Sequence, residues 1–266
     1  MVINSTEHKK LLQVKVLLDS KYELYNKFDF IETDPIQVPH RFTKKQDIEI
    51  SAFLTATIAW GQRKSIIKNA KNLMSLMENE PFDFLVNASD NEIKRFTYFV
   101  HRTFQGIDCK FFIESLKNIY VKHKGLETVF TKGYEQNSSI FSAISHFREV
   151  FFSITYPPRT SKHISDVTAN SSAKRINMFL RWMVRKDSNG VDFGLWNKIP
   201  TSALMLPLDL HTGNVGRRLQ ILTRKQNDWL AVNEITEILR LFDVKDPIKY
   251  DFALFGIGAF EGLDKI

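Results

Sequence analysis

The chain has 266 residues, of which 43% are hydrophobic and 25% charged, and its formal net charge is +7. These values exclude a disordered chain and a mini-domain, and the positive charge alone is weak evidence for a nucleic-acid partner. The single cysteine, Cys109, excludes an internal disulfide, an iron–sulfur cluster held by four thiolates and a cysteine-rich zinc site. Residues 1–10 lack an apolar signal core and no apolar run could span a bilayer, so we expect a cytoplasmic protein without membrane contact.

Apolar residues recur mostly at helical spacing, and Gly and Pro are scarce, at 11 and 8 residues. No segment alternates like a strand, and no internal repeat is found. The sequence therefore predicts an all-α fold. The expected helices cover residues 8–27, 46–60, 63–77, 90–100, 109–122, 138–153, 173–186, 211–222, 228–242 and 247–257. Residues 33–42 and 156–172, with two prolines each, are predicted connectors.

The helix predicted over residues 173–186 has the clearest apolar stripe, and Ser171 or Ser172 is expected to cap it. Residues 159–186 carry seven Lys and Arg side chains against one acidic residue. This run is either a solvated basic face or a phosphate-binding surface, which would offset the repulsion between Arg181 and Arg185.

Lys174 falls in the first turn of this helix, where the helix dipole and Arg175 both disfavour an ammonium. A lysine held partly deprotonated there would be a nucleophile, whereas the simpler interpretation is a surface charge.

Asp209 follows an apolar approach, residues 204–208, and precedes a predicted helix. Its usual role would be an N-cap, although the apolar approach would also partly bury the carboxylate. His211 would by default be a structural histidine. No second cluster of Asp, His or Cys has metal-binding spacing and no serine stands on a nucleophile elbow, so neither a metal nor another cofactor is expected.

Residues 172–181 (Ser-Ala-Lys-Arg-Ile-Asn-Met-Phe-Leu-Arg) and 206–211 (Leu-Pro-Leu-Asp-Leu-His) together resemble the catalytic core of the helix-hairpin-helix DNA glycosylases, especially the 8-oxoguanine DNA glycosylases. Lys174 matches the family's catalytic lysine and Asp209 its catalytic aspartate. The turn at residues 60–63 is similar to the one whose side chain fills the gap left in the duplex, and Gln62 matches that position. The block Lys-Arg-x-Asn-x-Phe-Leu-Arg-Trp-Met-Val-Arg also resembles that of a widespread bacterial family of uncharacterised proteins.

Two features depart from the glycosylase pattern. Residues 168–172 stand in place of the family's Gly-x-Gly hairpin turn without a glycine, although Asn170 could adopt the left-handed conformation. The 35 residues that separate Lys174 from Asp209 are more than the family usually has, which implies an insertion at about residues 187–200.

The resemblance implies a two-lobed helical fold with a cleft between the lobes. We expect residues 45–190 to form the lobe that ends in the hairpin and the Lys174 helix, and residues 1–44 with 191–266 to form the lobe that carries Asp209. A monomer is favoured.

The resemblance also implies excision of an oxidised base such as 8-oxoguanine from double-stranded DNA. Lys174 would be the Schiff-base nucleophile of a glycosylase with β-lyase activity, and Asp209 would stabilise the sugar cation. Two alternatives remain open, a catalytically inactive DNA-binding relative and a helical protein unrelated to nucleic acid. The expected DNA contacts are Gln62, Arg63, Arg175, Arg181, Arg185, His211 and Arg217.

Overall fold

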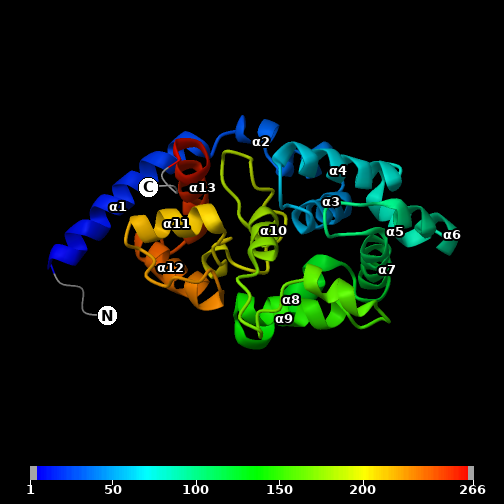
Figure 1. Cartoon of the computed structure of the whole chain (residues 1–266). Coiled ribbons are helices and arrows are strands. Elements are labelled where there is room, and N and C mark those ends of the chain that lie inside the picture. The colour runs from blue at the N-terminus through cyan, green and yellow to red at the C-terminus, as the bar shows by residue number, and fades with distance from the viewer. Residues whose placement is uncertain (1–4, 263–266) are drawn as a thin grey trace.

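The computed structural model describes residues 5–262, and in that range the chain forms helices and loops without a strand, which confirms the all-α prediction (Figure 1). Residues 1–4 and 263–266, which the predicted lobes include, lie outside the described range. The α-helices are α1 (Ser5–Tyr25), α2 (Phe30–Thr33), α3 (Lys45–Thr57), α4 (Arg63–Leu76), α5 (Pro81–Asn87), α6 (Asp90–Ile93), α7 (Gly106–Lys122), α8 (Leu126–Asn137), α9 (Ile140–Phe151), α10 (Lys174–Val184), α11 (Leu210–Arg218), α12 (Trp229–Phe242) and α13 (Tyr250–Gly256). Shorter 3₁₀ turns are η1 (Pro35–Gln37), η2 (Pro39–Arg41), η3 (Lys94–Tyr98), η4 (Pro158–His163), η5 (Thr201–Ala203) and η6 (Pro247–Lys249), and η7 (Ile257–Glu261) is a π-helix.

Most helices fall within a few residues of their predicted bounds, and the differences have local causes. The helix expected over 90–100 is instead the single turn α6 followed by η3. No helix was predicted at α5 or α8. Gly133 lowers the helix propensity of α8, yet a Cβ there would lie 2.9 Å from the backbone of Ala143 in α9. Close packing of α8 on α9 therefore requires the residue that weakens the sequence signal.

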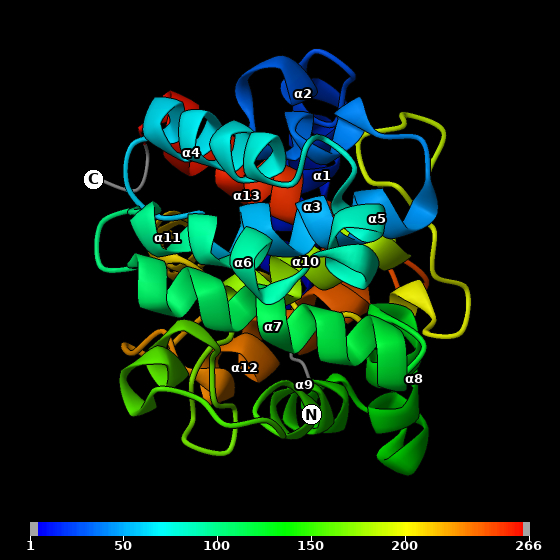
Figure 2. The ribbon, with the colours of Figure 1, turned by 90° about the vertical axis from the view of Figure 1, so that its right-hand side faces the viewer.

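The helices gather in two groups with α10 between them (Figure 1). Helices α3 to α9 form one group, and α1, α11, α12 and α13 form the other. Helix α10 packs on α3, while α1 and α11 both pack on α13. In the turned view α3 and α10 lie between α4 and α7 (Figure 2), and α3 is buried over ten consecutive residues.

The grouping differs from the predicted lobes in two segments, the turns η1 and η2 and the loop around Trp196. The turns η1 and η2 belong to the segment assigned to the lobe of residues 1–44, but they pack against α3, and η1 also contacts α4.

Residues 187–200, predicted to be an insertion, contribute to the core. Trp196 is buried, and its Nε1 donates to Glu49 Oε1 of α3 at 2.8 Å. Tyr120 Oη donates to the other oxygen of Glu49 at 2.7 Å. Burial raises the pKa of Glu49, and these two donors partly oppose the shift. The loop is therefore anchored on α3, a helix with ten consecutive buried residues.

Candidate active site

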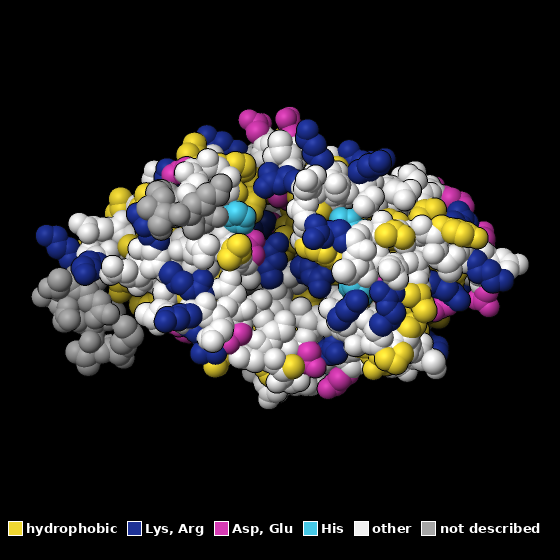
Figure 3. Space-filling model, viewed as in Figure 1, with side chains coloured by type: hydrophobic (Ala, Val, Ile, Leu, Met, Phe, Trp, Pro, Cys, Tyr) yellow, Lys and Arg dark blue, Asp and Glu magenta, His cyan; other side chains and the backbone are white. Residues whose placement is uncertain are grey.

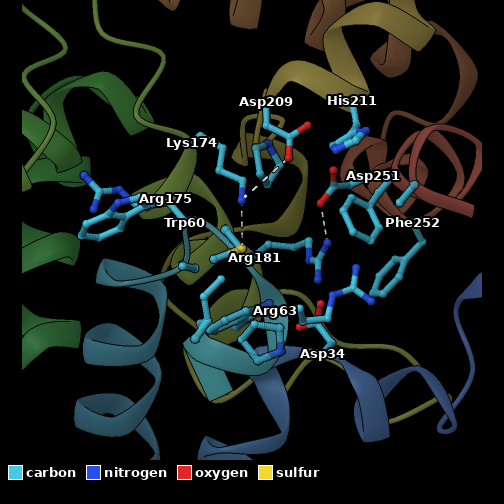
Figure 4. Close-up of a pocket in the computed structure, with 18 of the residues that line it drawn as sticks. Asp34, Trp60, Arg63, Lys174, Arg175, Arg181, Asp209, His211, Asp251 and Phe252 are labelled. Carbon is cyan, nitrogen blue, oxygen red and sulfur yellow. Dashed lines mark hydrogen bonds and ion pairs between the residues drawn. The ribbon is translucent and has the colours of Figure 1, made fainter. Parts of the chain in front are cut away.

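A cavity of about 510 Å³ lies between the two groups of helices. The molecular surface is hollowed near the centre of the face seen in Figure 1, and Lys and Arg side chains surround the hollow (Figure 3). The wall is built by the α3–α4 turn, the start of α10, the residues around Asp209, and α13. Residues 30–35 also contribute to the wall. The polar and aromatic lining residues include Asp34, Trp60, Arg63, Lys174, Arg175, Arg181, Asp209, His211, Asp251, Phe252 and Phe255 (Figure 4).

The structure brings Lys174 and Asp209 together in this cavity. Lys174 is the first residue of α10, Asp209 directly precedes α11, and the Lys174 Nζ lies 3.8 Å from the Asp209 Oδ2 (Figure 4). The other carboxylate oxygen, Oδ1, accepts the Thr212 amide at 3.0 Å, while Thr212 Oγ1 accepts the Asp209 amide at 2.8 Å. The N-cap prediction for Asp209 is confirmed. One oxygen caps the helix and the other faces the amine, so the two roles do not exclude one another.

The start of α10 differs from the expected serine cap. Ala173 is the N-cap residue, its backbone is left-handed with φ +48°, and no side chain caps the first turn. Ser171 Oγ instead accepts the Ala173 amide, and the carbonyl of Ser172 accepts Asn177 Nδ2 at 3.1 Å. The first-turn amides of α10 are thus left without a side-chain acceptor at the edge of the cavity.

The hairpin before α10 forms its turn without glycine. Asn170 has φ +62°, the left-handed conformation that the sequence left open for it. Asp166 stabilises the turn, because its Oδ1 accepts the amide and the hydroxyl of Thr168 and its carbonyl accepts the Ser171 amide.

Arg175 lies at the cavity wall but is held by protein groups. Its guanidinium stacks on the Trp60 ring, 4.8 Å from the centroid, and donates to the carbonyls of Thr57 and His163. Burial lowers the pKa of Arg175 to about 10. These contacts tie α10 to the end of α3, and the expected contact between Arg175 and DNA phosphate stays a prediction.

The prediction that Arg185 binds DNA phosphates is wrong, because its side chain is 0% exposed. Its guanidinium donates to three carboxylates, those of Asp187, Asp192 and Asp246. The neighbouring charges raise the pKa of Arg185, although burial opposes them. The sequence showed only the like charge at Arg181, since these aspartates come from loops that fold back onto α10.

Arg181 is also buried, and the phosphate contact predicted for it is likewise not the contact observed. It pairs with Asp192 at 3.2 Å and with Asp251 of α13. Its guanidinium also stacks on Phe252, 4.3 Å from the ring centroid. Arg181 therefore joins α10 to α13 at the cavity floor.

Two acidic residues of the site escaped the sequence analysis. Burial, with a smaller contribution from the charge of Asp209, raises the pKa of Asp251 to about 6, although Arg181 and Lys174 oppose the shift. Burial also raises the pKa of Asp34, whose Oδ1 accepts the Ile36 amide at 3.0 Å. A signal for Asp251 was present, because it is a lone acidic residue among the aromatic and apolar residues of a predicted helix.

The remaining predicted contacts lie at different distances from the cavity. Gln62 is exposed and directly precedes α4, beside the lining residue Arg63. Arg63 lies over the rings of Phe255 and Phe260 at 5.5 and 5.7 Å. His211 lines the cavity.

Arg217 does not line the cavity. It donates to the Arg224 carbonyl at 2.8 Å and to Asn227 Oδ1 at 2.6 Å. Arg217 therefore makes a supporting contact within the protein, and its predicted phosphate contact stays a prediction.

A family described as "Protein of unknown function (DUF2400)" has a model that matches residues 34–260. The chain belongs to this family. No curated protein and no solved structure matches it. The matched range includes every lining residue named above, from Asp34 to Phe255.

Two kinds of feature are absent from the described residues of this DUF2400 member. Within residues 5–262, no group of three or more His, Cys, Asp or Glu side chains is arranged to hold a metal ion. Across the same range, every helix is too short or too polar to cross a membrane.

Proposed function

We propose that this protein is a DNA base-excision glycosylase with lyase activity that acts on an oxidised base, such as 8-oxoguanine, in duplex DNA. One observation carries the proposal: an amine and a carboxylate from separate helices approach to 3.8 Å in a cavity of about 510 Å³. That volume is within the range of small-molecule pockets, and the aromatic walls suit a flat base. The fold proposed with this activity is the two-lobed helix-hairpin-helix arrangement, with the cavity as its cleft.

The substrate nucleotide would leave the duplex and enter the cavity, at a cost of a few kcal/mol of unstacking. Trp60 and Phe255, which are only partly buried at the cavity wall, offer ring surfaces to the base. Gln62, exposed beside the cavity, would enter the vacated position in the stack.

The chemistry would begin with the Lys174 amine in its neutral form, after its proton has passed to solvent, while Asp209 stays ionised 3.8 Å away. The free amine then attacks C1′ of the sugar while the bond from C1′ to the base breaks, and the proton that the attacking nitrogen loses passes to the departing base. The charge of Asp209 stabilises the cation that grows on the sugar, an interaction that is strong where water is excluded. The resulting Schiff base permits β-elimination of the 3′ phosphate.

Borohydride trapping tests this proposal directly. The full chain is mixed with duplexes that carry 8-oxoguanine, an abasic site or no lesion, and reduction captures any Schiff base as a covalent adduct. We expect an adduct with a lesion duplex from the wild type and from Lys186→Gln, whose exposed lysine follows α10, but none from Lys174→Gln. Asp209→Asn should slow excision while the helix cap persists, because an amide oxygen can also accept the Thr212 amide. Absence of an adduct with every lesion, or an adduct that survives in Lys174→Gln, would contradict the proposal.

A second candidate is a DNA-binding relative without catalysis. The close carboxylate of Asp209 favours it, since an amine in an ion pair carries a proton and is not a nucleophile. Such a protein would bind lesion duplexes with a steep dependence on salt and form no adduct. Failure to bind any duplex would exclude both candidates.

A further inference from the structure

The hairpin before Lys174 and the residues around Asp209 both contact one short loop, residues 223–228, which joins α11 to α12. Helix α10 packs mainly on α3, and α11 packs on α13. The loop therefore offers a direct path between the two segments that carry the proposed catalytic pair.

On the hairpin side, the contacts involve Asp228 and its neighbour. Asn170 Nδ2 donates to Asp228 Oδ2 at 2.9 Å, and the Trp229 amide donates to the Asn170 carbonyl at 3.1 Å. Ser171 and Asp228 also form an isolated β-bridge. Both the side chain and the carbonyl of Asn170, the left-handed residue of the turn, are thus hydrogen-bonded to residues at the start of α12.

On the other side, the contacts involve Asn227. Its Nδ2 donates to the Asp209 carbonyl at 2.9 Å, while its Oδ1 accepts Arg217 Nη2 at 2.6 Å. A Cβ at Gly213, in the first turn of α11, would lie 2.7 Å from Asn227 Oδ1. The absence of a side chain at Gly213 therefore lets the Asn227 amide sit directly against the turn that begins at Asp209.

The loop itself is held in place by two acidic residues. Asp228 accepts both Arg224 Nε and the Ala231 amide, so it caps α12 while it holds Asn170. Glu234 accepts the amides of Thr223 and Arg224. The consecutive residues Asn227 and Asp228 thus act from a loop with little freedom of its own.

We propose that Asn227 and Asp228 are positioning residues that fix the hairpin of Lys174 and the loop of Asp209 on one support, and so set the distance between amine and carboxylate. The hairpin turn then serves as a joint, a contact that links the Lys174 segment to the 223–228 loop, which gives a reason for a turn built on Asn170. The activity test of this proposal rests on the proposed function.

The test compares Asn227→Ala and Asp228→Ala with a matched control, Asp243→Ala. Asp243 lies at the other end of α12, where it accepts two backbone amides and pairs with Lys249, and it does not line the cavity. Single-turnover trapping on saturating lesion duplex should slow about 10- to 100-fold in the two loop variants, because small displacements of reacting groups have effects of that size. Duplex affinity should change less than about 3-fold.

Asp228→Asn should recover only part of the rate, since its one amide oxygen can keep the bond from the Ala231 amide while its NH2 group replaces the oxygen that accepts from Asn170. Asp243→Ala should keep the wild-type rate. Equal slowing in Asp243→Ala and Asp228→Ala, or wild-type rates in both loop variants, would overturn the positioning role.

Hydrogen exchange of the unliganded protein provides a readout that needs no activity. In Asn227→Ala and Asp228→Ala, amide exchange should accelerate both in residues 168–174 and in residues 207–213, and Asp243→Ala should leave both segments unchanged. Faster exchange confined to residues 223–228 would contradict the claim that this loop links the two segments. If the wild type forms no adduct with any lesion, the glycosylase proposal fails, and the exchange experiment still decides whether the loop couples the two segments.

Discussion

The two ends of α10 carry side chains of the same kind and meet opposite surroundings. At the first residue, Lys174 reaches into the cavity toward one carboxylate and keeps about a quarter of its side-chain surface exposed, at 26%. Near the last turn, Arg181 and Arg185 are enclosed among four aspartates, those at positions 187, 192, 246 and 251. Helix α10 thus has an accessible amine at its start and a buried ionic network at its end. The comparison teaches that local charge density does not predict whether a basic side chain of α10 is exposed or buried, because its acidic partners are brought from other segments.

The largest expected effect concerns the accessible end. Lys174→Gln should reduce adduct formation by more than about a thousandfold, as loss of a covalent nucleophile does elsewhere. Its unfolding free energy should change by less than about 1 kcal/mol, because a partly exposed ion pair contributes little to stability. Trapping and urea unfolding of the same variant check both parts. A strongly destabilised Lys174→Gln would show that Lys174 has a structural role like that of Arg181 and Arg185, and the two ends of α10 would no longer differ.

The buried end should show the reverse behaviour. Arg185→Ala leaves several carboxylates unpaired in the core and should destabilise the fold by about 3–5 kcal/mol. Urea unfolding measures this loss, with Lys186→Gln as the control that stays within about 0.5 kcal/mol of wild type. An Arg185→Ala protein of normal stability but weakened DNA binding would restore the phosphate role that its burial contradicts.

Asp251 tests the ionic network through pH. Its pKa is raised to about 6 in the folded protein, mainly by burial, against about 3.9 in an unfolded chain. The folded state therefore holds this proton more tightly, and the resulting stabilisation is complete below about pH 4 and is lost as the pH rises through 6. Between pH 4 and 7 the wild type should lose about 2–3 kcal/mol more than Asp251→Asn. Parallel stability profiles of the two proteins would contradict the raised pKa.

Arg175 lies between the two extremes and should show the smallest effect. Arg175→Lys keeps the charge but loses the planar stacking on Trp60 and one of the two carbonyl contacts, so it should destabilise the fold by about 1–2 kcal/mol. Thermal unfolding checks this value. A variant as stable as wild type with a reduced affinity for duplex DNA would instead assign Arg175 to the DNA-binding surface.

The sequence was a good guide where a feature depends on neighbours in the chain. The apolar stripe of α10, the capping role of Asp209 and the left-handed turn at Asn170 all follow from residues a few positions apart. It missed α8, because Gly133 lowers the helix propensity of this segment and is required there by the close packing of α8 on α9. It also misplaced the cap of α10, because Ala173 takes the N-cap position in the left-handed conformation and the Ser171 hydroxyl accepts the Ala173 amide instead.

The sequence by itself determined the helical class, most helix bounds and the two residues that meet in the cavity. Only the tertiary structure decided that they lie 3.8 Å apart, that Asp251 and Asp34 share their cavity, and that Arg185 is sealed from solvent. The physical reason is the range of the interactions. Helix periodicity and capping act over a few residues, whereas the burial and the partners of a charge depend on segments that only the folded chain brings together.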